Sequence, residues 1–202
     1  MEVKLTDITA GAEGRIAEYA AICYDSKTDA DSNERRIKNL LKLKHLATLR
    51  FAYATFKVSD ISRACSHQLV RHPHLSYLQR SQRYCSESKQ GYVFPPNYSI
   101  GFLDDEEAEV NHIFDEVEMI ANWAYRSLIK HGYKKGDARY VLPQAVTTEL
   151  YVTGNFQAWY DFLSKRTDKA AQWEIRYVAV EIAKELSVYA PNIFGGFVDA
   201  AN

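Results

Sequence analysis

Apolar side chains recur every three or four residues over several stretches of the chain, which is the spacing of one helix face. Residues 14–24 and 32–44 show this pattern, and Ser32 is a candidate N-cap of the second stretch. The pattern is clearest over 104–131, where acids gather at the start, basic residues at the end, and Gly132 follows. Its apolar stripe comprises Val110, Ile113, Phe114, Val117, Ile120, Ala124 and Leu128. Such a helix extends about 42 Å, which is long for a 202-residue monomer and hints at an oligomer.

Alternation of side chains over residues 48–58 predicts a strand. One face would carry Leu49, Phe51 and Tyr53, and the other Ala52, Ala54 and Phe56. Because both faces are largely apolar, this strand is expected in the middle of its sheet. Residues 60–70 predict a helix that Asp60 caps, and it should end near Arg71 because Pro73 disfavours helical geometry in the residue before it.

The C-terminal half alternates between the two kinds of element. Residues 144–153 predict a strand, and Asn155 can cap a helix that runs through Leu163. A second helix is expected over 168–188 and should end before Pro191. The fold class predicted from these patterns is α+β.

Composition excludes several classes of protein. The 25 lysines and arginines nearly balance 26 aspartates and glutamates, and 47% of residues are hydrophobic, so the chain is neither disordered nor histone-like. Three widely spaced cysteines give no disulfide framework, and no histidine spacing suggests a metal site. No apolar run approaches the roughly 20 residues of a membrane span, and the first residues carry no signal core. We therefore expect a cytoplasmic protein without a metal or a membrane partner.

The segment from Ile61 to Ser86 contains no acidic residue. Its basic residues are Arg63, Arg71, Arg80, Arg83, His67, His72 and His74. Basic donors interleaved with glutamine and serine suit a phosphorylated ligand whose base is also recognised. A solvated basic loop, or a surface that pairs with the acids of residues 104–118, explains the charge equally well.

The order of residues in this segment is more specific than its charge. Arg71-His72-Pro73 is followed after seven residues by Ser81. This resembles the signature of the flavin-dependent thymidylate synthases, which is Arg-His-Arg followed after seven residues by Ser. All residues of the signature match except the second arginine, which is Pro73 here. A second set in the family's order and spacing is Ala138-Arg139-Tyr140-Val141-Leu142-Pro143, Asn155, Phe162-Leu163-x-x-Arg166 and Ala171-Gln172-Trp173-Glu174-Ile175-Arg176. The resemblance spans about residues 45–190.

The resemblance implies a fold and a reaction. The fold would be a single domain over residues 1–202, with a central, mostly antiparallel sheet flanked by long helices. The reaction would convert dUMP to dTMP, with 5,10-methylenetetrahydrofolate as carbon donor and NADPH-reduced FAD as hydride source. No cysteine nucleophile is implied. The assembly would be a homotetramer with active sites shared between chains, and nucleic acid would not be a partner.

The resemblance also implies roles for residues. Arg166 would be catalytic, because a fixed cation beside the uracil lowers the pKa of the ring N–H by about 1–3 units. The residues implied for dUMP are Gln68, Arg71, Gln79, Ser81, Gln82, Arg83, Arg139 and Arg166. Those implied for FAD are His45, Arg71, His72, Pro73, Gln79, Asn155, Phe156, Gln157 and Asp161.

Ordinary structural roles compete with several of these assignments. Arg166 could be a surface residue paired with Asp161 or Asp168, and Asn155 could simply cap its helix. Gln68 could be a satisfied core amide, and a lone histidine such as His45 is more often structural than functional.

Pro73 departs from the family motif, because proline lacks both the charge of arginine and a backbone N–H. FAD would then bind more weakly, or His74, Arg80 or Arg63 would compensate. Two other functions therefore stay open. One is a family member that has lost its flavin, and the other is a nucleotide- or RNA-binding module that uses residues 71–84.

Overall fold

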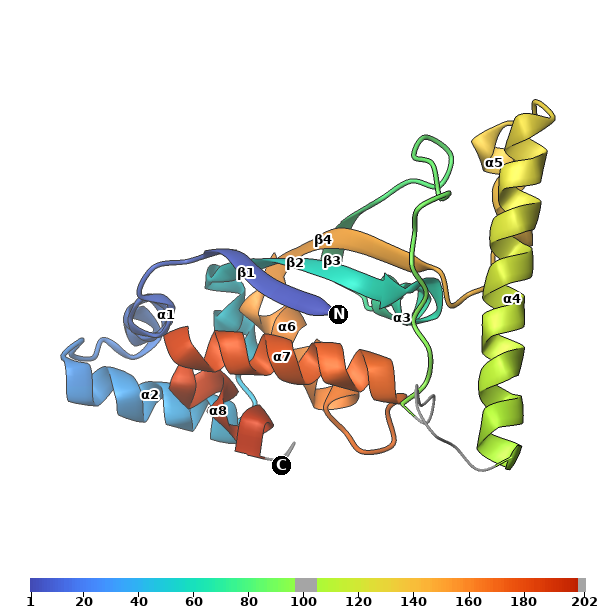
Figure 1. Ribbon diagram of the computed structural model, residues 1–202. Coiled ribbons are helices and arrows are strands. Elements are labelled where there is room, and N and C mark those ends of the chain that lie inside the picture. Colours follow the sequence, from blue (N-terminus) through green and yellow to red (C-terminus); the bar gives the residue numbers. More distant parts are fainter. Residues whose placement is uncertain (97–104, 200–202) are drawn as a thin grey trace. The chain divides into compact units, whose positions relative to one another are not determined.

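A four-stranded antiparallel sheet organises the chain in the computed structural model, which describes residues 1–96 and 105–199. The strands are β1 (Glu2–Ile8), β2 (Tyr53–Ser62), β3 (Leu75–Gln79) and β4 (Thr147–Asn155). Their order in the sheet is β1-β2-β4-β3, so β2 is an interior strand as its apolar faces predicted. The antiparallel sheet and its helices confirm the α+β class (Figure 1).

Helices precede, connect and follow these strands. They are α1 (Ala12–Ala21), α2 (Ala30–Lys42), α3 (Arg63–Leu69), α4 (Asp105–Lys130), α5 (Lys135–Ala138), α6 (Phe156–Arg166), α7 (Trp173–Tyr189) and α8 (Pro191–Asp199). Short 3₁₀ turns cover Ile22–Tyr24, Leu46–Phe51 and Arg139–Val141. None of the helices in the described ranges is long and apolar enough to cross a membrane.

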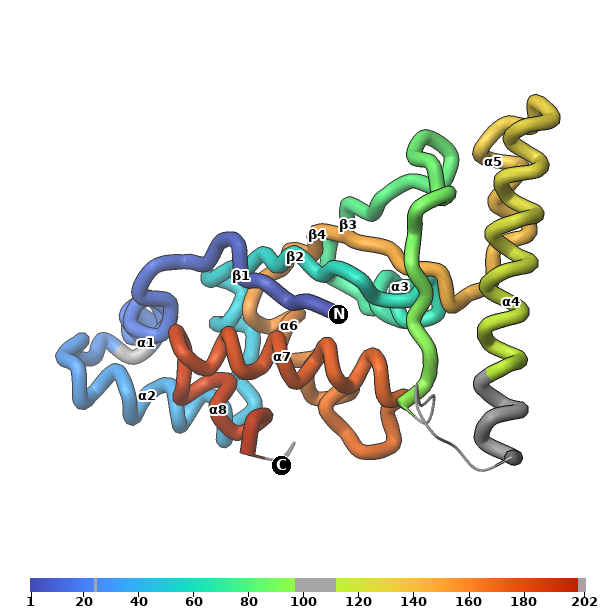
Figure 2. The backbone as a smooth tube through the Cα atoms, in the orientation of Figure 1, coloured from blue at the N-terminus to red at the C-terminus, as the bar shows by residue number. Residues whose placement is uncertain are grey.

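The chain forms two compact units. The first comprises Met1–Val58, His67–Leu78 and Leu150–Asn202, and the second comprises Ser59–Ser66 and Gln79–Glu149. Figure 2 follows the backbone through both of them. The single domain expected over residues 1–202 stays a prediction.

The core of the first unit lies between one face of the sheet and its helices. Ala54, Phe56 and Val58 alternate along β2 with exposed or partly exposed residues, so only one face of the strand is fully buried. Trp159 of α6 packs edge-on against Phe56 at 5.1 Å and donates a hydrogen bond from Nε1 to the Ala54 carbonyl at 3.0 Å. The helices α6, α7 and α8 lie on this side of the sheet (Figure 1).

Gly154 of β4 marks a close approach between neighbouring strands, and we expect Gly154→Ala to destabilise the protein. A Cβ at this position would lie 2.3 Å from Cδ2 of Leu75, a buried residue of β3. Overpacking of this kind costs about 1–3 kcal/mol, measurable as a lower urea midpoint. Gly14→Ala is the matched control, since a Cβ there meets no atom within 4 Å. Equal midpoints for the two variants would contradict the close packing of β3 on β4.

The second unit contains the long helix α4, which confirms the element predicted over 104–131. Gly132, at φ 87°, follows its end as expected. The residues of the predicted apolar stripe whose side chains are described are exposed or partly exposed. Ile113, Val117 and Ile120 are exposed, whereas Ala121 and Tyr125 form the buried face. Val110 lies outside the described side chains.

Two predicted elements begin later than expected. The strand predicted at 48–58 starts at Tyr53, because the preceding residues form a 3₁₀ turn. Asp60 is a strand residue with φ 55° and does not cap α3. The Cys65 N–H is instead bound by the Ser62 hydroxyl at 2.9 Å, which makes Ser62 the capping residue.

One other predicted boundary was wrong, at the start of α2, and one was confirmed, since α7 ends before Pro191. Asp29, not Ser32, caps α2, because its carboxylate accepts the N–H of Ser32 at 3.0 Å. Pro191 follows α7 but begins α8, where proline is well suited because the first helical N–H has no intrahelical partner.

Candidate active site

Three of the nine residues implied for flavin meet in one cavity of the first unit, called here the α6 cavity. Its volume is about 250 Å³. It is lined by Arg50, His74, Asn155, Gln157, Ala158 and Asp161. The structure thus brings Asn155, Gln157 and Asp161 together, and adds Arg50 and His74 to them.

The N-terminus of α6 forms one wall of this cavity. Asn155 has extended backbone geometry and accepts the N–H of Ala158 on Oδ1 at 2.9 Å, so it is the N-cap that the sequence predicted. The Phe156 N–H donates to the Ala52 carbonyl at 2.8 Å, which ties this turn to the start of β2. Helix N-termini favour anionic ligand groups, because their N–H groups and the helix dipole point toward the ligand.

His72 anchors the loop before β3 to α6 and does not enter the cavity. Its ring is buried, packs edge-on against Phe162 at 5.4 Å, and lies 3.2 Å from the Ala158 carbonyl through Nε2. Burial lowers the pKa of His72, and the hydrogen bond to Ala158 opposes that change. A neutral ring that donates from Nε2 satisfies this site. His72 therefore positions its neighbour His74, which lines the cavity at φ 67°.

Phe156 is also a core residue, and its role as a flavin contact stays a prediction. Its side chain is fully buried and packs against Phe194 at 5.0 Å. Arg71 and Pro73, by contrast, are exposed and do not line the cavity. Their roles toward FAD stay predictions.

Arg166 is the last residue of α6 and is partly buried. Within the described part of the chain, no ion pair joins it to Asp161 or Asp168, so the proposed surface pairing is not seen. Its charge contributes to the lowered pKa of His72, although less than burial does. A guanidinium without a carboxylate partner is available to a ligand. Gln68, on α3, is partly buried, and its role stays a prediction.

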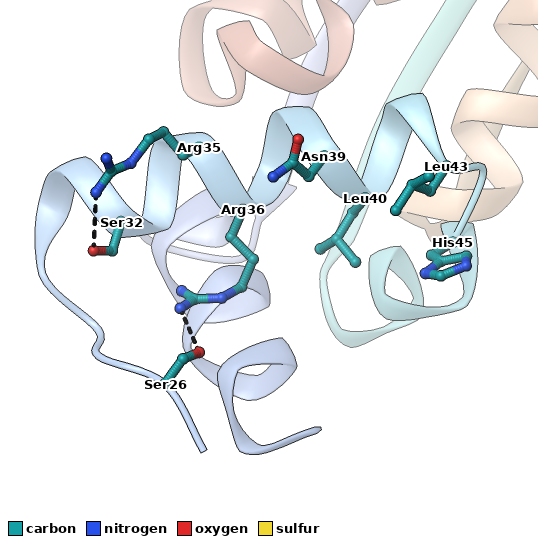
Figure 3. A pocket seen from close by; sticks show the side chains of 8 residues that line it. All are labelled: Ser26, Ser32, Arg35, Arg36, Asn39, Leu40, Leu43 and His45. Carbon is teal, nitrogen blue, oxygen red and sulfur yellow. Dashed lines mark hydrogen bonds between the residues drawn. The ribbon is translucent and has the colours of Figure 1, made fainter. Parts of the chain in front are cut away.

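His45 lies in a different pocket of the first unit. This pocket, on α2 and the residues on either side of it, has a volume of about 350 Å³ (Figure 3). It is lined by Ser26, Ser32, Arg35, Arg36, Asn39, Leu40, Leu43 and His45. Arg36 is held by Ser26 at 2.8 Å and by the Lys27 carbonyl at 2.7 Å, so it fixes the loop before α2. The structure therefore does not place His45 in the α6 cavity.

Arginines gather in the second unit, in a set called here the arginine cluster. It comprises Arg63, Arg80, Arg83 and Arg139. Gly136 lies close to two members, because Arg139 Nε donates to its carbonyl at 3.1 Å and a Cβ built on Gly136 would lie 3.6 Å from Arg83 Cγ. Burial lowers the pKa of Arg63, Glu87 opposes this, and Arg139 lowers it further. Such a concentration of positive charge is the chemistry that binds a phosphate.

The turn after β3 presents this cluster. The Ser81 carbonyl accepts the N–H groups of Tyr84 at 3.2 Å and Cys85 at 2.9 Å. The Ser81 hydroxyl accepts the Arg83 N–H at 3.3 Å, so the turn is closed by both its backbone and its side chain. Ser81, Gln82 and Arg83, which the sequence grouped, thus lie in one ordered turn.

Glu87 is the buried counter-charge of the cluster. Its carboxylate Oε1 lies 3.6 Å from Arg80 Nε, and its N–H donates to the Tyr125 hydroxyl at 3.1 Å. Burial raises the pKa of Glu87, while Arg80, a hydrogen bond from Gln82, and Arg63 oppose this. Glu87 therefore couples the Ser81 turn to the arginines beside it.

Gln79 serves the interior of the second unit. Its side-chain nitrogen donates to the hydroxyls of Ser66 at 2.9 Å and Thr148 at 3.3 Å. These bonds fix the end of β3 against α3 and β4. The contacts with dUMP and FAD that the resemblance implies for Gln79 stay predictions.

The side chains that a covalent nucleophile or a metal would use are dispersed. Cys65 is buried, Cys85 is partly buried and Cys23 is exposed. Across residues 1–96 and 105–199, no three His, Cys, Asp or Glu side chains are grouped to hold a metal ion.

Sequence reasoning did not assign Arg50 or Glu87 to a site, and it named Arg63 only among the cations that could compensate for Pro73. Arg63 lies inside the acid-free segment from Ile61 to Ser86, so the sequence already indicated it as a candidate cation. Arg50 precedes that segment, and Glu87 directly follows it. Only the fold places each of them beside the predicted residues.

Comparison with known proteins places the chain in a family. Residues 4–192 match the family model described as thymidylate synthase complementing protein. The chain belongs to the thymidylate synthase complementing protein family. Two similar proteins, each named flavin-dependent thymidylate synthase, come from Mycobacterium tuberculosis (33% identical, covering 94% of this chain and 82% of the relative) and Mycobacteroides abscessus (32%, covering 90% and 78%). A third of the same name, from Mycobacterium marinum, is 30% identical and covers 97% and 84%.

In this protein, Glu87 should make folding stability depend on pH. Its pKa is raised in the folded state, so the unfolded chain releases this proton first as pH rises above about 4.3. The contribution of Glu87 to the free energy of unfolding therefore falls with rising pH. Glu87→Gln should remove that part of the pH dependence. The free energy of unfolding of the variant should therefore rise relative to that of wild type between about pH 4.5 and pH 7.5. Urea titrations across this range measure it.

Glu185→Gln, at an exposed acid of α7, is the control for loss of one carboxylate. If the wild-type and Glu87→Gln stability curves run parallel with pH, burial does not perturb Glu87 as described.

Proposed function

We propose that the protein is a flavin-dependent thymidylate synthase that reductively methylates dUMP to dTMP. The carbon would come from 5,10-methylenetetrahydrofolate and the reducing hydride from NADPH through FAD. The observation that carries this proposal is the ordered Ser81 turn. It holds Arg83 close to Gly136, whose carbonyl accepts a hydrogen bond from Arg139, and this arrangement supports a phosphate site at the positions of the family motif. Reduced folate and NADPH suit a cytoplasmic location.

The arginine cluster would hold the nucleotide through its phosphate. A phosphate monoester carries a charge near −2 at neutral pH, and Arg83 and Arg139 would each supply one positive charge. Arg63 adds a third, which Glu87 partly offsets. Ser81 and Gln82 would add hydroxyl and amide donors from the same turn. The site therefore discriminates a nucleotide from a nucleoside by charge.

Arg166 would act on the base. The guanidinium stays charged at all relevant pH values and presents a planar fork of donors. Placed against the uracil, it stabilises the negative charge that forms when the ring N–H ionises. Gln68 and Arg71 would orient the nucleotide from α3 and the loop after it.

The α6 cavity fits one anionic and polar part of a flavin nucleotide. Its lining combines the guanidinium of Arg50, the imidazole of His74 and the amides of Asn155 and Gln157 beside a helix N-terminus. Asp161 adds an acceptor for a hydroxyl or N–H group. When bound, reduced FAD would supply the hydride. His45, in the pocket of Figure 3, would contribute on the folate side.

A homotetramer with shared active sites is part of the proposal. The support is the exposed apolar surface of α4, where Met119, Ile120 and Trp123 are 64%, 58% and 70% exposed. Large apolar patches on a soluble chain are typical of protein interfaces. Sedimentation velocity of the purified protein tests this, and a monomer at micromolar concentration would contradict it.

Anaerobic spectroscopy and product analysis test the activity. Protein loaded with FAD should be yellow and should bleach with NADPH. With dUMP and labelled methylenetetrahydrofolate it should form labelled dTMP. A colourless protein that binds dUMP without FAD would instead indicate a family member that has lost its flavin. RNA binding without dTMP formation would favour a nucleic-acid-binding module.

A further inference from the structure

We propose that Arg50 supplies to the α6 cavity the positive charge that Pro73 lacks, and that it binds the pyrophosphate of FAD. This inference rests on the proposed function. Position 73 carries arginine in the family motif, and here it carries an uncharged residue without an N–H donor. The two phosphates of FAD still need cationic partners.

The geometry of Arg50 suits this role. It belongs to the 3₁₀ turn Leu46–Phe51, and its Nε donates to Gln157 Oε1 at 2.6 Å. That bond fixes the plane of the guanidinium at the start of α6. Among the described residues, no carboxylate forms an ion pair with Arg50. Its two terminal nitrogens are therefore free to donate to two phosphate oxygens.

The surroundings of Arg50 link it to the site of the missing arginine. His74, the residue directly after Pro73, lines the same cavity. The N-terminus of α6 adds a favourable dipole, and the Gln157 N–H lacks an intrahelical acceptor as in any first helical turn. Asp161 is the one acid of the lining, so Arg50 offsets its charge before an anion enters.

The other candidate cations are engaged elsewhere. Arg80 donates from Nη2 to the Ser86 carbonyl at 2.9 Å and lies 3.6 Å from Glu87. Arg63 is partly buried and belongs to the same arginine cluster of the second unit. The α6 cavity is lined by neither of them, whereas both Arg50 and His74 line it.

Flavin titrations of the full-length apoprotein test this role without using activity. Flavin fluorescence should show that Arg50→Ala weakens FAD binding about 10- to 150-fold, the loss of one charge-assisted contact. Riboflavin lacks the phosphates, so its affinity should change less than about 3-fold. Arg50→Lys, which keeps charge but loses the fork, should fall in between. Arg15→Ala, at an exposed arginine of α1, is the control and should bind FAD like wild type.

A second substitution tests the relation to Pro73 directly. In the Arg50→Ala background, Pro73→Arg should restore at least about 10-fold of the lost FAD affinity. In the wild-type background, Pro73→Arg should raise FAD affinity by a smaller factor, because Arg50 already provides the charge.

Three results would overturn the inference. Arg50→Ala could bind FAD as tightly as wild type, or FAD and riboflavin affinities could fall equally, which would show a packing role. Equal gains from Pro73→Arg in both backgrounds would show that the two positions act independently. If wild-type protein binds no FAD at all, the proposed function itself fails, and the inference fails with it.

Discussion

Arg166→Lys should lower the rate of dTMP formation about 10- to 1,000-fold while leaving FAD bound. The range assumes that an ammonium that cannot bridge the base loses the 1–3 pKa units by which a cation fixed against the base favours its ionisation, or about 1.4–4 kcal/mol. Lysine keeps the charge but loses the planar fork that can bridge a ring oxygen and nitrogen. Rapid-quench measurement of dTMP in a single turnover reports this step.

The position of Arg166 makes its neighbour a useful control. Lys165 is exposed on the same last turn of α6 and is equally close to the negative end of the helix dipole. Lys165→Ala should therefore reproduce any general effect on helix stability but keep the rate. Wild-type turnover in Arg166→Lys would remove Arg166 as the group that activates the base.

Arg83→Ala and Arg139→Ala should each weaken dUMP binding about 10- to 150-fold, because each removes a charge-assisted contact with the phosphate. Isothermal titration with dUMP measures this loss, and deoxyuridine is the matched ligand without a phosphate. Its affinity should be nearly unchanged in both variants. The loss should also shrink at high salt, since exposed charges are screened.

Arg126→Ala provides a control for loss of a nearby cation. Arg126 is exposed and donates from Nη2 to the Ser88 carbonyl at 2.9 Å, and it lies outside the arginine cluster. If Arg126→Ala weakens dUMP binding as much as the cluster variants do, the loss of affinity comes from the overall positive charge of this region and not from a specific contact. Unchanged affinity in both cluster variants would remove the phosphate assignment.

Elements with strong local signals could be predicted from sequence, and those decided by tertiary contacts could not. The cap at Asn155 and the stop at Gly132 depend on the residue itself, and both were found. Asp60 looked like a cap by residue type, but the pairing of β2 continues through it to Ser62. The apolar stripe of α4 was correctly recognised as helical, yet periodicity does not say whether its partner lies within the same chain.

The candidate site shows the same division. Motif spacing identified the Ser81 turn and the start of α6, because those residues are close in sequence. It does not show that the side chains of His72 and Phe156 turn into the core. It also missed Arg50, which is brought to Gln157 across 107 residues of chain. Residues that are so far apart in the chain produce no local sequence pattern that would predict their contact.

The burial of Trp159 gives the protein an internal optical reporter. Its indole is fully buried and hydrogen-bonded, and it directly follows Ala158 of the α6 cavity in sequence, whereas Trp123 is 70% exposed. The two should therefore emit at different wavelengths, with Trp159 toward the blue. Tryptophan emission overlaps flavin absorption, so energy transfer from Trp159 can follow the filling of the cavity in real time. Trp173 is the third tryptophan and is partly exposed, so a Trp123→Phe, Trp173→Phe double variant would leave Trp159 as the remaining emitter.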